Sequence, residues 1–245
     1  MKSNLAVRLP RVSVLYAVQA CTVSFLARRS NPVGTCPHTY FSITHSRMAK
    51  SNSKVGVGAC SWPRGKPLLV RYHNKEWGKP VRNDRKIFEF LILESAQAGL
   101  SWLTILSKRE GYRRAFANFE PKKISKFGRQ DIARLLDNPN IVRNRLKIEA
   151  AINNATKFLE VQKEFGTFSK YMWGFVGGEP IDGRRKSLKD LPEYTEESKA
   201  FAQDLKRRGF KFLGPTVVYA HMQAVGMIND HIETCFRYQD LKNRR

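Results

Sequence analysis

Apolar residues recur with helical spacing from about residue 84 onward. The segment "RKIFEFLILESAQAG" (85–99) places apolar side chains at 87, 88, 90, 91 and 98, a pattern typical of one buried helix face. We expect Asp84 to be the N-cap, because a carboxylate can accept hydrogen bonds from the unpaired N–H groups of a first helical turn. Gly99 ends or bends this helix, and residues 100–116 continue with helical spacing.

Four segments further along show the same spacing together with helix boundary signals. Residues 130–138 form a short amphipathic pattern closed by Asn-Pro-Asn, and residues 143–165 form a long one. Residues 195–209 begin with a Thr cap and Glu in the first turn, and end in basic residues and Gly. Residues 215–231 begin with Pro, which first helical turns favour. No alternating pattern is long enough to build a sheet, so we predict an all-α protein.

Residues 132–152 predict a helix, a tight turn and a second helix, which together make a helix-hairpin-helix arrangement. Such a hairpin can aim backbone N–H groups at a DNA phosphate. Arg143, Arg145 and Lys147 would add cationic DNA contacts on the same side. An ordinary pair of helices with solvated basic side chains fits this segment equally well.

Glu94 lies in the middle of the apolar helical pattern of residues 85–99. On a helix it shares a face with Ile87, Phe90 and Leu91, so its carboxylate points toward the apolar interior or a pocket within it. A buried carboxylate costs free energy unless it has a partner. An Arg or a backbone N–H can satisfy it permanently, or a ligand can do so on binding.

The charge balance of the chain indicates a polyanionic partner. The 245 residues include 44 Lys and Arg against 21 Asp and Glu, which gives a net charge of +23. Nucleic acid is the commonest partner for such an excess, although a ribosomal-type or merely soluble basic protein fits the charge as well. Four Cys are too few for a disulfide scaffold and indicate a reducing compartment. No apolar run reaches the roughly 18 residues of a membrane-spanning helix.

Residues 1–55 differ in composition and are excluded from the predicted fold. The first acidic residue of the chain is Glu76, and the excluded segment holds eight Lys or Arg among many Ser, Thr and Val. This composition is typical of an organellar transit peptide. A secretory signal over residues 12–27 and a translation start at Met48 are the alternatives. Residues 56–245 are predicted to form the helical domain, where 36 basic against 21 acidic residues leave +15.

Two Cys and two His form a candidate metal site. His231 and Cys235 are four residues apart, so on a helix both side chains would face one ion. Cys60 and His73 stand at the start of the globular part, and one zinc ion would therefore join its two ends. Unremarkable buried thiols are the alternative. Cys21 and Cys36 fall in the excluded leader, and His221 is expected to pack in the core.

Aromatic side chains cluster in sequence around Glu94, namely Trp62, Tyr72, Trp77 and Trp102. Large aromatic side chains ordinarily pack in a core. An acid in their midst instead suits a flat, cationic or electron-poor heterocycle, held by stacking and recognised by hydrogen bonds.

Several long blocks, in the right order, resemble one family. They are "ACSWP", "YHNKEWGKPVRNDRKIFEFLILESAQAGLSWLTILSKREGYRRAF", "KRRGFKFLGPTVVYAHMQAVGMINDH" and the terminal Cys235. The resemblance is to the DNA-3-methyladenine glycosylase I family, of the helix-hairpin-helix glycosylase superfamily. It runs from about Cys60 to Cys235 and so covers essentially the whole globular part.

The resemblance implies one structural zinc ion, held here by Cys60, His73, His231 and Cys235. It also implies a base pocket built on a Glu of the "ESAQAGLSW" block with three aromatic side chains, here Glu94, Tyr72, Trp102 and Trp62. The chain departs from the family's commonest pattern at Ser95-Ala96 and at the hairpin turn, where "NPNIVRNRLK" has no glycine.

The activity implied is hydrolysis of the N-glycosidic bond of 3-methyladenine in alkylated duplex DNA, a step of base excision repair that leaves an abasic site. The enzyme would be monofunctional, with water as the nucleophile. A glycosylase for another damaged purine is one alternative, and a zinc-stabilised DNA-binding module without catalysis is the other. We expect a monomer without a membrane partner. Its location would be the mitochondrion or another DNA-containing organelle if the leader is a transit peptide, and the nucleus or cytoplasm otherwise.

Overall fold

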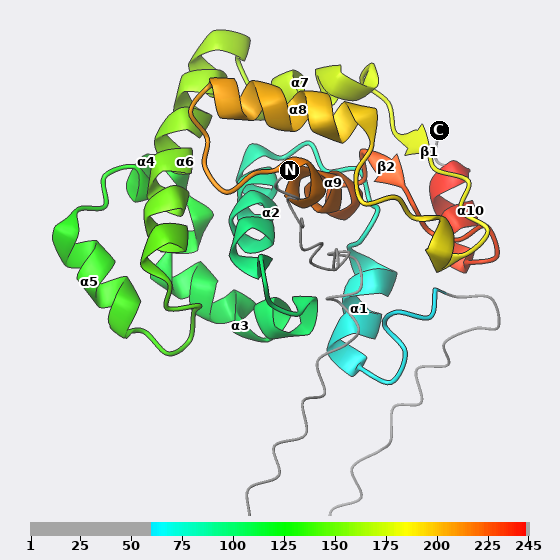
Figure 1. The fold of residues 1–245 in the computed structure, drawn as a ribbon, viewed down its shortest axis with the longest axis horizontal. Helices are drawn as coiled ribbons and strands as arrows, with labels where there is room; N and C mark the ends of the chain where they lie inside the picture. The colour runs from blue at the N-terminus through cyan, green and yellow to red at the C-terminus, as the bar shows by residue number, and fades with distance from the viewer. Residues whose placement is uncertain (1–59, 244–245) are drawn as a thin grey trace, which may run out of the picture.

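The computed structural model describes residues 60–243, and the predicted leader lies outside them. Helix α2 (Asp84–Gln97) lies centrally in the fold and contacts α3, α6, α7 and α9 (Figure 1). The remaining helices are α1 (Pro67–Lys75), α3 (Trp102–Ala115), α4 (Pro121–Ile124), α5 (Arg129–Asp137), α6 (Arg145–Phe165), α7 (Phe168–Trp173), α8 (Glu196–Arg207), α9 (Pro215–Ala224) and α10 (Phe236–Lys242). Three 3₁₀ turns accompany them, η2 (Ala117–Phe119), η3 (Gly174–Val176) and η4 (Leu188–Asp190).

The prediction of a helical fold is confirmed, with one small addition. Strands β1 (Ile181–Asp182) and β2 (Ile228–Asn229) pair in parallel, with Ile181 opposite Ile228. Two residues per strand are too few to leave an alternating pattern in the sequence. In the described part of the chain, no helix is both long and apolar enough to cross a membrane.

The start of α2 differs by one residue from the prediction. Asn83, not Asp84, is the N-cap, and its side-chain oxygen accepts the backbone N–H of Lys86 at 3.0 Å. The Asp84 carboxylate instead accepts the backbone N–H groups of Phe168 and Ser169, both at 2.8 Å. Asp84 therefore ties the start of α2 to the first turn of α7, a contact that no local pattern reveals.

The helix predicted over residues 215–231 is too long, because α9 ends at Ala224. Gly226 follows with φ +73, and a Cβ atom there would lie 2.3 Å from the carbonyl carbon of Lys79. The close approach of these two backbones makes the chain leave the helix before β2. His231 and Cys235 consequently lie in a turn between β2 and α10, and the assumption that they share a helix was wrong.

The predicted pair of helices around residues 132–152 is present as α5, a connecting loop of residues 138–144, and α6. Helix α3 holds this loop, because Tyr112 Oη accepts the backbone N–H of Val142 at 3.2 Å and Lys108 Nζ donates to Pro139 O at 2.6 Å. No residue of the loop has a positive φ, so the turn closes without the glycine that the sequence lacks.

Candidate functional site

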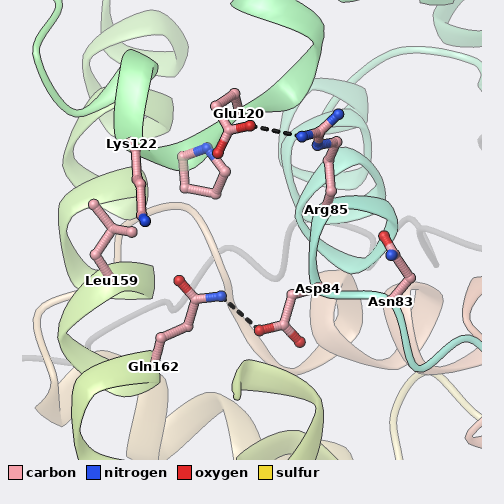
Figure 2. A pocket seen from close by; sticks show the side chains of 8 residues that line it. Asn83, Asp84, Arg85, Glu120, Lys122, Leu159 and Gln162 are labelled. Carbon is pink, nitrogen blue, oxygen red and sulfur yellow. Dashed lines mark hydrogen bonds and ion pairs between the residues drawn. The ribbon is translucent and has the colours of Figure 1, made fainter. Parts of the chain in front are cut away.

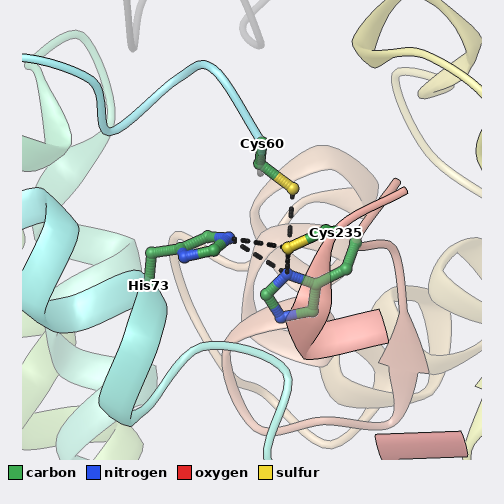
Figure 3. A group of neighbouring side chains, drawn as sticks. Cys60, His73 and Cys235 are labelled. Carbon is green, nitrogen blue, oxygen red and sulfur yellow. Dashed lines mark hydrogen bonds between the residues drawn. The ribbon is translucent and has the colours of Figure 1, made fainter. Parts of the chain in front are cut away.

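Cys60, His73, His231 and Cys235 converge in the interior, as the sequence predicted. Figure 3 shows Cys60, His73 and Cys235 pointing toward one another. All four are buried, and their ligand atoms lie within 4.8 Å of one another. His73 comes from α1, a helix that the sequence reading missed, and the other three come from segments outside the helices.

The spacing of these donor atoms fits a tetrahedral zinc shell. Bonds of about 2.3 Å to sulfur and about 2.0–2.1 Å to nitrogen would place two nitrogens roughly 3.3 Å apart and a nitrogen and a sulfur roughly 3.6 Å apart. His73 Nε2 lies 3.1 Å from His231 Nδ1, and Cys235 Sγ lies 3.6 Å from each of these nitrogens. Cys60 Sγ lies 3.8 Å from His231 Nδ1. The donors are therefore close to the positions that zinc requires.

Each imidazole has a protein partner on the ring nitrogen that faces away from the cluster. His73 Nδ1 lies 2.7 Å from Asn74 Oδ1, and His231 Nε2 lies 3.2 Å from the carbonyl oxygen of Trp77. Such outer acceptors set the tautomer and orientation of a metal-binding His. Neither partner was predicted, because a neighbouring amide and a backbone carbonyl carry no sequence signal.

The pKa shifts of His231 and Cys235 suit a metal, whereas a hydrogen bond with Cys235, burial and the Cys235 charge raise the pKa of Cys60. Burial lowers the pKa of His231, which keeps the imidazole neutral. A hydrogen bond with Cys60 and others with the two imidazoles lower the pKa of Cys235. Neutral imidazole and thiolate are the forms that bind metals.

Three of the predicted aromatic side chains form a connected group. The rings of Tyr72 and Trp102 have centroids 5.3 Å apart at 58°, and those of Trp62 and Tyr72 are 6.4 Å apart at 64°. Tyr72 and Trp102 are buried, and Trp62 is half-buried. Trp77 contacts Trp62, with centroids 5.4 Å apart, and also packs against the imidazole of His231, with centroids 4.4 Å apart, so it joins the aromatic group to the Cys and His cluster.

Glu94 lies beside this aromatic group and is 5% exposed. Phe90, about one turn before Glu94 on α2, has its ring centroid 6.2 Å from that of Tyr72, and burial and the nearby Glu94 charge together raise the pKa of Tyr72 well above its usual value. Burial raises the pKa of Glu94 itself to about 8. Among the described residues, none gives Glu94 a hydrogen bond or an ion pair, and the buried Trp102 Nε1 also has no acceptor.

Glu89 on the same helix shows what a partnered buried acid looks like. It is 3% exposed, and its carboxylate binds Arg109 at 2.7 Å, Lys86 at 3.0 Å and Arg113 at 3.1 Å. Basic side chains from α2 and α3 thus satisfy Glu89 fully, while Glu94, little more than one turn later, receives none. The unpartnered carboxylate is a property of that one position and not of the helix.

The three basic residues predicted to contact DNA lie in different environments. Arg143 and Arg145 are exposed at the start of α6, and Arg145 approaches Glu149 at 3.5 Å. Lys147 is half-buried, and its ammonium donates to the carbonyl oxygens of Ala96 at 2.8 Å and Ala98 at 2.6 Å. No described contact tests the DNA role of these side chains.

A separate hollow lies between α2, α4 and α6, with a volume of about 370 Å³ (Figure 2). Four of its polar side chains are already paired, since Arg85 binds Glu120 at 2.7 Å and Gln162 donates to Asp84 at 2.6 Å. It contains no aromatic side chain. This hollow lacks the features that recognise a flat heterocycle.

Comparison with known proteins places these features in a family. The Methyladenine glycosylase family profile matches residues 62–238. The chain is 44% identical over 176 residues to the "DNA-3-methyladenine glycosylase" of Haemophilus influenzae, covering 72% of this chain and 95% of that protein. It is 41% identical over 179 residues to the "DNA-3-methyladenine glycosylase 1" of Escherichia coli K12, covering 73% and 96%. The solved 3-methyladenine DNA glycosylase I of Staphylococcus aureus, a structure concerned with 3-methyladenine recognition, superposes with a TM-score of 0.71 at 40% identity, covering 73% of this chain and 95% of that one.

Proposed function

The chain belongs to the methyladenine glycosylase family, and from this premise we propose that it hydrolyses the N-glycosidic bond of 3-methyladenine in alkylated DNA. The product is an abasic site, and the reaction is a step of base excision repair. The observation that carries the proposal is Glu94, a buried carboxylate beside Tyr72 and Trp102 that has no partner among residues 60–243.

The pocket suits a cationic purine. Methylation at N3 puts positive charge on the base, so the base is already a good leaving group and the enzyme need not supply a strong acid. Stacking and cation–π attraction from Trp102, Tyr72 and Trp62 contribute on the order of 0.5–2 kcal/mol each. These contacts offset the few kcal/mol needed to unstack the nucleotide. They explain why aromatic side chains surround the acid.

Glu94 changes its protonation state when the cationic base arrives. Its pKa of about 8 in the empty pocket means that the carboxyl is largely protonated at neutral pH. A positive charge within hydrogen-bonding distance favours the carboxylate. The ionised Glu94 then accepts a hydrogen bond from the exocyclic amine and favours the cation over neutral adenine.

Water is the nucleophile in this proposal, and the enzyme is monofunctional. The one lysine considered for a covalent route is Lys147, whose amine would have to attack a deoxyribose aldehyde. Its Nζ already donates hydrogen bonds to the carbonyl oxygens of Ala96 and Ala98, and these would have to break before the amine could attack a sugar.

We propose that Cys60, His73, His231 and Cys235 hold one zinc ion with a structural role. The donor spacing and the outer partners of both imidazoles support this assignment. Four protein ligands complete a tetrahedral shell, and such closed sites stabilise folds. The ion would cross-link the first and last described segments of the chain.

We also propose that α5, the loop of residues 138–144 and α6 act as the DNA-binding hairpin of the helix-hairpin-helix superfamily. The exposed Arg143 and Arg145 at the start of α6 support phosphate contacts there. The enzyme would act as a monomer on double-stranded DNA.

Release of free 3-methyladenine from methylated duplex DNA tests the proposed function. Wild type should release this base, and Glu94→Gln should release it at least about tenfold more slowly, because a charge-assisted hydrogen bond is lost. Glu193→Gln is the matched control, since Glu193 is an exposed acid outside the pocket, and it should release the base at the wild-type rate. Release of a different purine would identify a related glycosylase, and DNA binding without release of any base would identify a binding module.

The leader remains a separate proposal. Residues 1–55 have the composition of an organellar address. A chain beginning at Met48 should fold and release base normally but no longer reach an organelle in cells. Unfolding of that shorter chain would mean that the leader is part of the fold and that the predicted domain boundary is wrong.

A further inference from the structure

We propose that Lys147 is a positioning residue of the base pocket: from α6 it holds the end of α2, and so sets the relative placement of Glu94 and Trp102. The inference rests on the proposed function and assigns Lys147 a role other than the phosphate contact expected from the sequence.

The contact that carries the proposal joins two distant parts of the chain. Lys147 lies in the first turn of α6, and its Nζ donates to Ala96 O at 2.8 Å and to Ala98 O at 2.6 Å. These acceptors lie 51 and 49 residues earlier in the sequence. One ammonium therefore bridges two carbonyls at the point where α2 ends.

The end of α2 needs a cation from elsewhere. The last carbonyl oxygens of a helix accept no N–H from within the helix and carry a partial negative charge that cations stabilise. Helix α2 has no basic residue in its last turn, and although the backbone N–H of Leu100 donates to Gln97 O at 2.6 Å, the carbonyls of Ala96 and Ala98 take their hydrogen bonds from Lys147. Lys147 supplies both the missing hydrogen bonds and the missing positive charge.

The held carbonyls lie between the two pocket residues. Glu94 is two residues before Ala96, and Trp102 is four residues after Ala98. Gly99, with φ +78, turns the chain between them, and Ser101 caps the start of α3 by accepting the N–H of Thr104 at 3.1 Å. A shift of this turn would change the angle between α2 and α3, and with it the spacing of the carboxylate and the indole.

The surroundings of Lys147 also differ from those of a free surface charge. Its side chain is half-buried, whereas Arg143 and Arg145 just before it are exposed. Burial lowers the pKa of Lys147, whereas a lysine fully exposed to water keeps its usual pKa. Two carbonyl acceptors offset the loss of hydration.

The test separates binding of the base from binding of DNA. Lys147→Met keeps the apolar stem and the helix propensity but removes the ammonium. Affinity is measured for free 3-methyladenine, and separately for duplex DNA with an abasic-site analogue over a range of salt concentrations. We expect the affinity for the free base to fall about tenfold or more, while the dependence of DNA affinity on salt stays at the wild-type slope.

The opposite result identifies a phosphate contact. If Lys147→Met binds free 3-methyladenine normally and the slope of log K against log salt falls by about 0.9, the proposal is overturned. Arg143→Met is the matched control, because its exposed guanidinium should change the salt slope and leave the affinity for the free base unchanged.

Two further variants keep the test decisive if Lys147→Met folds poorly. Lys147→Arg and Lys147→Gln both retain N–H donors for the two carbonyls, and both should bind the free base more tightly than Lys147→Met. Equal weakness of all three variants would overturn the positioning role. Failure of wild type to bind or release 3-methyladenine would instead overturn the proposed function, so the two failures are distinguishable.

Discussion

Glu94 and His221 are buried polar side chains that no other described residue satisfies. Glu94 has neither a hydrogen bond nor an ion pair, and both ring nitrogens of His221 lack a partner. Orphaned polar groups cost free energy in the folded state. Glu94 has a proposed ligand, whereas His221 has no role in the proposed chemistry, so substitutions at the two positions should differ in their effect on function.

Replacement of Glu94 by Gln should leave the protein as stable as wild type or more stable, with an advantage that grows with pH. The folded pKa is about 8, raised by burial from 4.5. Below pH 4.5 both states of wild type are protonated, and no stability is lost. Between pH 4.5 and about pH 8, Glu94 ionises in the unfolded chain but not in the folded chain. Wild type therefore loses stability as pH rises to about 8. The loss is on the order of a few kcal/mol.

Denaturant titrations of wild type and Glu94→Gln at pH 5 and pH 8.5 measure this difference. Affinity for 3-methyladenine should fall about 10–100-fold in the same variant. Strong destabilisation with normal base binding per folded molecule would make Glu94 a structural partner, and the pocket assignment would then fail.

Replacement of His221 by Phe should stabilise the protein by about 1–3 kcal/mol, because two unsatisfied ring nitrogens disappear from the interior. Burial lowers the pKa of His221 from 6.5 to about 3. As pH falls from 6.5 toward 3, His221 takes up a proton in the unfolded chain but not in the folded chain, so wild type loses stability. The variant should resist acid better, which thermal unfolding at pH 7.5 and pH 4 measures. A larger advantage at pH 7.5 than at pH 4 would contradict this account.

At the scale of elements, the placement of the hairpin depends on α3. The loop of residues 138–144 lies on α3 at Gly111, where an added Cβ atom would come within 2.2 Å of Asn140 O. Only a glycine allows this approach, so the α5–α6 hairpin and the α2–α3 turn are positioned by the same helix. The proposed DNA contacts and the proposed base pocket would thereby be linked through α3 and through Lys147.

Gly111→Ala should therefore displace the hairpin, weaken DNA binding and cost about 1–3 kcal/mol of stability through overpacking. Gly128→Ala is the control, because a Cβ atom at Gly128 meets nothing within 4 Å. Binding to a duplex with an abasic-site analogue and denaturant titration measure the two effects. Equal DNA affinity of Gly111→Ala and wild type would show that the loop moves without consequence.

At the scale of the whole molecule, the two ends of the described chain meet at the Cys and His cluster. Cys60 and His73 come from the first described segment and helix, and His231 and Cys235 come from the turn before the last helix. A zinc ion there would act over more than 150 residues of chain, so its removal should affect folding before chemistry.

Cys235→Ala should lose zinc and unfold at a lower temperature than wild type, and a chelator should lower the melting temperature of wild type but not of the variant. Elemental analysis and thermal unfolding are the measurements. Cys36→Ala, in the leader, is the control and should keep one zinc per chain. Well-folded, active wild type with far less than one zinc per chain would rule out the structural zinc.

The sequence by itself determined the features that depend on local pattern. Helical periodicity predicted α2, α3, α5, α6 and α8, because a buried face repeats every three to four residues wherever the helix packs. It also identified Glu94 as an acid within an apolar face, and long matching blocks identified the family. These properties are encoded in neighbouring residues and need no knowledge of distant contacts.

Only the tertiary structure decided which distant groups satisfy one another. Asp84 binds the first turn of α7 instead of capping its own helix, and α9 stops at Ala224 because Gly226 meets Lys79. Lys147 meets the end of α2, and Glu94 is left without a partner within the described part of the chain. Hydrogen bonding and close packing depend on distance in space, and the spacing of residues along a chain does not specify that distance once the chain has turned.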